Sequence, residues 1–189
     1  ATALTAPVSH LIIRNYIGET LSWEDAGYWQ AIWYISTMYL MVVTTTLSVY
    51  YLPKLSGITE KAELRKELRQ GYKIIMPIVI VLSATVFLLK DFIILLLFTE
   101  EFAPMRELFL WQLVGDVIKV AALLMAYLMH AKAMMKTYIS TEIVFSISFT
   151  LLSIWFVDQF GLLGMSYSFA VNYTAYLIVV FMVTRRQWI

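Results

Sequence analysis

The sequence contains no cysteine and few charged residues. Of its 189 residues, 14% are charged and 61% are hydrophobic, whereas a soluble domain carries about 25% charged and about 45–50% apolar residues. The absence of cysteine excludes a disulfide framework, a thiolate metal site and a cysteine nucleophile. The two histidines, His10 and His130, lie far apart in the sequence and are a poor basis for a metal site. No metal and no cofactor are therefore expected.

Long apolar runs account for most of the sequence. Each has about 20 residues or more and is long enough to cross a hydrocarbon core about 30 Å thick. Such runs exclude a soluble globular enzyme, a disordered chain and a secreted disulfide scaffold. The fold class expected is all-α, namely a polytopic bundle of transmembrane helices.

The complete spans are predicted at about 26–52, 74–98, 105–130, 137–157 and 162–184. A first stretch, 2–17, is too short to span unaided, and the chain opens without an initiator Met, so we expect a piece of a longer protein. Pro53 is expected to end the first complete span, since proline cannot continue a helix. At Lys90 and Asp91 two alternatives stay open: one long helix through Phe98, or a short second helix in the membrane surface.

Residues 54–73 form the only long hydrophilic stretch, and 59–70 are predicted to be helical. Leu64 and Leu68 fall on one face of this helix and basic side chains on another. Such a basic amphipathic segment suits the headgroup layer, and a solvated connecting helix is the alternative.

Basic residues predict the orientation. Ten of the 14 lie in the 53–73 and 131–136 loops and in the tail, at Arg185 and Arg186, whereas the alternate ends, including 18–25 and 99–104, are acidic. Because cytoplasmic loops carry the excess of Lys and Arg, the basic loops and the C-terminus are predicted to be cytoplasmic.

Polar side chains inside the spans are the candidate functional residues, because intramembrane charges usually face a bundle interior or a water-filled cavity. Gln112, Asp116 and Lys119 are spaced i, i+4, i+7, which places them on one helical stripe. Gly115 beside them permits close approach of another helix. Two interpretations stay open: Asp116 and Lys119 pair within their own helix, or the stripe lines a polar path.

Arg14 is the remaining strong candidate. Its side chain either snorkels to the outer boundary or offers a planar fork to a phosphate or carboxylate. Gln30, Glu142 and Asn172 are weaker candidates. Glu142 lies near the cytoplasmic end of its helix, which favours an interfacial role, and a central Asn172 favours a helix–helix hydrogen bond.

Aromatic residues cluster around the outer end of one span, at Trp23, Tyr28, Trp29, Trp33 and Tyr34. An interfacial belt is the favoured interpretation, and stacking on sugar rings is the alternative. The sequence shows no Gly-rich phosphate loop, paired-aspartate metal motif or credible Ser/His/Asp set. Nothing in these residues therefore argues for an enzyme, although they do not exclude one.

Several segments resemble the Wzx-type polysaccharide flippases of the MOP exporter superfamily, which include bacterial lipid III and O-antigen flippases. The most specific is Trp111–Val120, and others are the Ser22–Gly27 turn, Ser48–Pro53 and Ala131–Ala133. The match runs in order to about residue 136 and fades in the last two spans. The resemblance implies that residues 1–189 form the C-terminal lobe of a twelve-helix, MATE-like exporter.

The resemblance also implies a function for the full-length protein. Such proteins move an undecaprenyl-pyrophosphate-linked oligosaccharide across the bacterial inner membrane by alternating access, drawing on an ion gradient. The implied pathways are O-antigen, enterobacterial-common-antigen-type or capsular polysaccharide biosynthesis. The implied partners are the lipid-linked oligosaccharide, membrane lipids, the N-terminal lobe and polysaccharide polymerase machinery, with no nucleic acid.

Two rival functions stay open. One is another exporter of the same fold, for the peptidoglycan lipid precursor or for drugs. The other is a membrane-embedded glycosyltransferase or polymerase, which should show a large outer loop or a metal-binding acidic pair. Within the flippase hypothesis, Lys119 has a nearby acid in Asp116, so Arg14 is predicted to be the freer cation and to contact the anionic headgroup.

Overall fold

The computed structural model describes residues 2–189 and the side chains from Thr5 onward. Its helices are α1 (Thr2–Thr20), α2 (Trp23–Thr46), the π-helical η1 (Leu47–Tyr51), α3 (Leu52–Gly57), α4 (Lys61–Leu88), α5 (Lys90–Leu97), the 3₁₀-helical η2 (Glu100–Leu108), α6 (Phe109–Ala131), α7 (Met135–Phe160) and α8 (Leu163–Trp188). Five helical runs are long and apolar enough to cross a membrane. The expected all-α, multi-pass bundle is confirmed.

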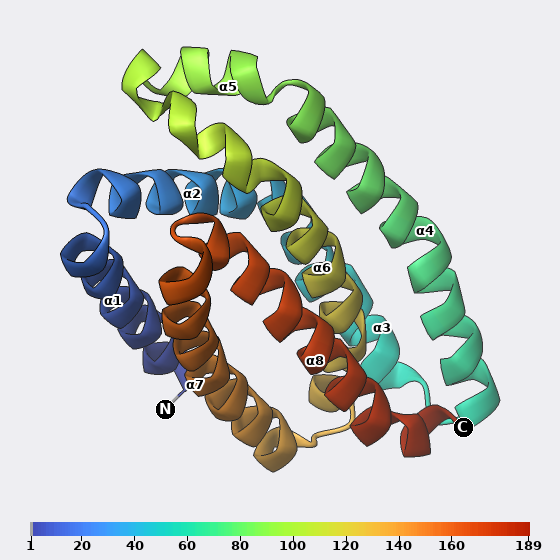
Figure 1. Cartoon of the computed structure of the whole chain (residues 1–189). Helices are drawn as coiled ribbons and strands as arrows, with labels where there is room; N and C mark the ends of the chain where they lie inside the picture. The colour runs from blue at the N-terminus through green and yellow to red at the C-terminus, as the bar shows by residue number, and fades with distance from the viewer. Residues whose placement is uncertain (1) are drawn as a thin grey trace.

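Helix α6 lies at the centre of the bundle. It packs along α8 on one side and α4 on the other, while α1 and α7 lie together at the far edge (Figure 1). Buried side chains occur on nearly every turn of α6, including Leu113, Val120, Leu124 and Leu128. A helix that is apolar on most sides is found in a protein core or across a membrane, and here neighbouring helices cover most of α6.

Pro53 does not end the first long span, contrary to the prediction. The helical path continues from α2 through the single π-helical turn of η1 into α3, and Pro53 lies in the first turn of α3. Proline is tolerated there because first-turn N–H groups have no intrahelical partner.

The amphipathic segment predicted at 59–70 is the beginning of α4 and not a separate helix. Leu64 and Leu68 are only 2% and 3% exposed and pack with Leu47 and Leu55. Other helices of the protein therefore cover the apolar face of this segment, for which lipid headgroups or solvent were the predicted surroundings.

The chain breaks between α4 and α5, at Leu89, so the alternative of one long helix through Phe98 is wrong. Figure 1 shows α5 turning away from the axis of α4 and running across one end of the bundle. Arg106 Nε of η2 contacts Asp91 Oδ1 of α5 at 2.8 Å. This exposed ion pair joins the short helix to the segment that leads into α6.

The loops at the opposite end are also linked. Lys132 Nζ, which follows α6, donates to the carbonyl oxygens of Leu55 and Ile58 at the end of α3. Cations suit a helix C-terminus because its last carbonyls lack intrahelical partners. Lys132 therefore holds the α3–α4 connection against α6.

Candidate functional site

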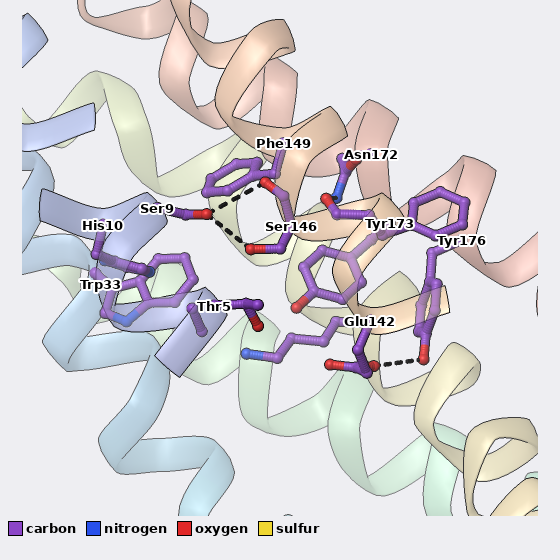
Figure 2. A pocket seen from close by; sticks show the side chains of 13 residues that line it. Thr5, Ser9, His10, Trp33, Glu142, Ser146, Phe149, Asn172, Tyr173 and Tyr176 are labelled. Atoms are coloured by element: carbon purple, nitrogen blue, oxygen red, sulfur yellow. Dashed lines mark hydrogen bonds between the residues drawn. The ribbon is translucent and has the colours of Figure 1, made fainter. Parts of the chain in front are cut away.

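A cavity of about 250 Å³ opens between α1, α2, α6, α7 and α8. It brings together three of the candidates predicted from the sequence, Lys119, Glu142 and Asn172. The other lining residues are Thr5, Ala6, Ser9, His10, Trp33, Phe145, Ser146, Phe149, Tyr173 and Tyr176. The site therefore combines charged and hydroxyl groups with a largely aromatic wall (Figure 2).

Lys119 is half-buried near the middle of α6. Its Nζ lies 5.3 Å from the ring centroid of Trp33, 5.6 Å from Tyr173 and 5.9 Å from Phe169. Aromatic faces attract a cation at such distances. No acidic side chain in the described part of the chain forms an ion pair with Lys119, so the predicted pairing with Asp116 is wrong.

Asp116 is completely buried among other helices. Its Oδ2 accepts a hydrogen bond from the Tyr39 hydroxyl at 2.9 Å, and that hydroxyl lies 3.1 Å from Ser83 Oγ. These contacts place Asp116 against α2 and α4, whereas Lys119 lines the cavity, although a three-residue spacing separates the two side chains by only about 60° around the helix. The predicted stripe is therefore split between two environments.

Gln112 belongs with Asp116 and not with the cavity. It is 1% exposed, and its Nε2, Asp116 Oδ1 and Ser36 Oγ have no hydrogen-bond partner among the described residues. Buried polar groups are normally hydrogen-bonded to protein or water, so these three atoms mark a polar cluster in the core between α2, α4 and α6. The expectation that Gln112 and Asp116 line the cavity is corrected.

Glu142 lies on the cavity wall, and Tyr176 donates to its Oε1 at 2.8 Å. The carboxylate of Glu142, a weaker cavity candidate in the sequence, is thus held by a tyrosine at the cavity wall. Ser9 Oγ of α1 and Ser146 Oγ of α7 are 2.7 Å apart, and Figure 2 shows them pointing toward each other. Asn172 donates to the Phe145 carbonyl at 3.3 Å, which is the helix–helix hydrogen bond expected.

Arg14 and Gln30 line a second hollow, a groove of about 370 Å³ between α1 and α2. Arg14 is exposed and forms no ion pair or hydrogen bond with any residue that the structure describes. Gln30 Nε2 donates to the Tyr34 hydroxyl at 3.1 Å. His10 and Trp33 line both the groove and the cavity, so the two hollows adjoin.

The outer aromatic cluster is not a simple interfacial belt. Trp29 is 2% exposed, and its ring stacks on His10 with centroids 5.1 Å apart. His10 also meets Trp33 edge-on at 4.1 Å. Trp23 and Tyr34 are exposed, as residues of an interfacial belt would be. Trp29 and Trp33 instead pack inward beside the cavity, so the belt interpretation does not hold for these two residues.

Together the two hollows suit a ligand that carries an anion and many hydroxyl groups. Lys119 and Arg14 supply cations that form no ion pair with any described residue, and the aromatic rings supply apolar faces for stacking. Acidic and histidine side chains within 2–189 form no cluster of three or more that could hold a metal ion.

Comparison with known proteins agrees with this chemistry. Residues 9–189 match a family model described as lipid II flippase MurJ. The chain belongs to the MurJ family. No solved structure matches it significantly.

Two curated relatives extend the MurJ assignment. Proteins named lipid III flippase from Escherichia coli (strain K12) and Shigella flexneri are each 40% identical over 192 residues, covering 98% of this chain. The chain spans 45% of the length of each relative. Both relatives are named as flippases, which agrees with the expected MOP-superfamily membrane protein.

In this MurJ-family chain, several cavity residues escaped the sequence reasoning. Ser9, His10 and Ser146 were not candidates, although a histidine and hydroxyls within apolar helices are a detectable signal. Tyr173 and Tyr176 gave no such signal, since tyrosine is common throughout the sequence. Only the packing of α1 against α7, and of α7 against α8, reveals that these residues share one cavity.

Proposed function

We propose that the full-length protein flips an undecaprenyl-pyrophosphate-linked oligosaccharide from the cytoplasmic to the outer face of the bacterial inner membrane. This chain would form the C-terminal lobe of an alternating-access transporter. The observation that carries the proposal is Lys119, a cation near the middle of a spanning helix that is surrounded by aromatic rings and forms no ion pair with any described residue, although Glu142 lines the same cavity. The identity to proteins named lipid III flippase supports the same substrate class.

The geometry suggests how such a headgroup is accommodated. A lysine at the centre of a spanning helix costs about 2.5–3.5 kcal/mol on insertion scales, and a hydrated cavity with an anionic ligand offsets that cost. Lys119 would meet the pyrophosphate in the inner cavity, and Arg14 would meet it in the adjoining groove. Charge-assisted hydrogen bonds to phosphate are roughly twice as strong as neutral ones. Lys119 and Arg14 would therefore each bind the pyrophosphate at one point of its passage through the lobe.

The proposed pathway is the assembly of a surface polysaccharide. O-antigen, enterobacterial-common-antigen-type and capsular repeats are the substrate candidates, with the polysaccharide polymerase machinery and the N-terminal lobe as partners and an ion gradient as the driving force. The peptidoglycan lipid precursor is the second candidate substrate, because the matching family is described as lipid II flippase.

The two substrates can be separated by complementation. The full-length parent is expected to restore surface polysaccharide in an Escherichia coli K12 strain that lacks its lipid III flippase. It is not expected to restore growth of a strain depleted of its lipid II flippase. Rescue of only the strain depleted of its lipid II flippase would indicate the peptidoglycan lipid precursor as the substrate. Failure to rescue either strain, with normal membrane levels of the protein, would contradict the flippase proposal.

The proposed orientation places the C-terminus and the basic loops in the cytoplasm. Single cysteines replacing Lys66 of α4 and Glu101 of η2, both exposed, are expected to react with a membrane-impermeant thiol reagent from opposite sides. The measurement uses the full-length parent in a cysteine-free background, in intact cells and in inverted vesicles. Labelling of both positions from the same side would contradict the orientation.

A further inference from the structure

The groove between α1 and α2 has a composition unlike the other side of α1. On that other side, Val8 and Ile12 meet Ile143, Ile147 and Leu151 in a hollow whose surface is almost entirely apolar. The groove is instead lined by Pro7, His10, Leu11, Arg14, Trp29, Gln30, Trp33 and Tyr34. Helix α1 therefore presents aliphatic and small hydroxyl side chains to α7, and aromatic, cationic and other polar side chains to α2.

The depth of the polar groups argues against acyl chains as the occupant of the groove. Gln30 lies seven residues after Trp23, the first residue of α2, which is about 10 Å along the helix axis. Arg14 lies six residues before Thr20, the last residue of α1, or about 9 Å. Polar groups at this depth are costly against hydrocarbon, so the groove suits a hydrated ligand.

We infer that this groove is a sugar-binding subsite, in which Tyr34 and Trp33 stack on sugar rings and Gln30 binds a hydroxyl or acetamido group. The inference rests on the proposed function and assigns the oligosaccharide part of the substrate. Tyr34 is 56% exposed, so its ring is accessible, and the Gln30 amide holds its hydroxyl at 3.1 Å. That bond uses one amide N–H, and Gln30 Oε1 remains an acceptor for a sugar N–H or O–H.

The position of the groove fits a ligand in which sugars follow a pyrophosphate. Trp33 lines both hollows, and Lys119 Nζ lies 5.3 Å from the Trp33 ring on the cavity side. A pyrophosphate held at Lys119 would therefore place its attached sugar beside Trp33 and the groove. Anion and sugar would be recognised by different residues of one continuous site.

Binding measurements on the full-length parent test this assignment. The two probes are undecaprenyl-pyrophosphate-linked oligosaccharide and undecaprenyl pyrophosphate without sugar. Tyr34→Ala is expected to weaken binding of the sugar-bearing probe about fivefold, the scale of one aromatic contact, and to leave the sugar-free probe unaffected. Tyr34→Phe should retain most of the affinity because the ring remains, whereas Gln30→Leu should again weaken only the sugar-bearing probe.

Tyr50→Ala is the matched control. Tyr50 lies in the same long span, is 74% exposed and is not part of the groove, so its removal should change neither affinity. Tyr34→Ala or Gln30→Leu variants that elute as wild type and bind both probes unchanged, or bind both equally weakly, would overturn the sugar subsite and leave the proposed function standing. Failure of the wild-type protein to bind either probe would instead contradict the proposed function.

Discussion

In the full-length protein, Lys119→Met is expected to abolish complementation of a flippase-deficient strain while membrane levels stay normal. Methionine keeps the length and apolar stem of lysine but removes the charge that lies among Trp33, Phe169 and Tyr173. Truncating one partner of a buried charge pair costs about 2–5 kcal/mol, so affinity for the pyrophosphate should fall at least about thirtyfold. Surface polysaccharide and membrane abundance of the protein are the two measurements.

Lys90→Met provides a matched control for this substitution. Lys90 Nζ also lies over an aromatic ring, 4.2 Å from the Phe87 centroid, but at the start of α5 and outside the cavity. The same loss of a cation–π contact there should leave complementation intact. Full activity of Lys119→Met, or equal loss from both variants, would contradict the role assigned to Lys119.

Complementation of the flippase-deficient strain also tests Arg14 independently of Lys119. Arg14→Ala is expected to abolish complementation, and Arg14→Lys to restore only part, because an ammonium lacks the bidentate fork of a guanidinium. Arg14→Ala with full activity would show that Arg14 only snorkels. Of the two candidate cations, only Lys119 would then bind the pyrophosphate.

The spanning helices could be predicted because apolar length is a local property of the sequence. The positions at which these helices are interrupted could be predicted less well. Pro53 was expected to end a helix because its missing N–H is costly in a helix interior, but a π-helical turn over Leu47–Tyr51 makes the residue part of a new first turn. The separation of α5 also depends on contacts, since Arg106 of η2 binds Asp91 of α5.

The candidate site was predicted only in part, for a geometric reason. Helical spacing showed that Asp116 and Lys119 lie near each other on α6, but not which neighbours surround each side chain. The Tyr39 hydroxyl of α2 donates to Asp116, whereas Trp33, six residues earlier in the same helix, lies near Lys119. Glu142 reaches the cavity through the packing of α7 against α8, which no pattern in a single sequence contains.

The close contact of α6 with α8 leads to the second large expected effect, a loss of stability in Gly115→Ala. A Cβ atom at Gly115 would lie 2.4 Å from Phe169 Cδ1 and 3.3 Å from the Ala170 Cα. Phe169 is 1% exposed and is held by Tyr173, whose ring centroid is 4.8 Å away. The ring has no free space to enter, so α6 and α8 must move apart.

We expect Gly115→Ala to lower the free energy of unfolding by about 1–3 kcal/mol, the usual cost of overpacking a core, although alanine is the better helix former by about 1 kcal/mol. Gly27→Ala is the matched control, because a Cβ atom at Gly27 of α2 would meet no atom within 4 Å. That variant should gain the helix propensity without the clash. Thermal unfolding of the detergent-solubilised full-length protein is the measurement. A Gly115→Ala variant that unfolds at or above the wild-type temperature would show that α6 and α8 are not as closely packed as described. The position of the Phe169 ring, whose centroid lies 5.9 Å from Lys119 Nζ, would then be adjustable and not fixed.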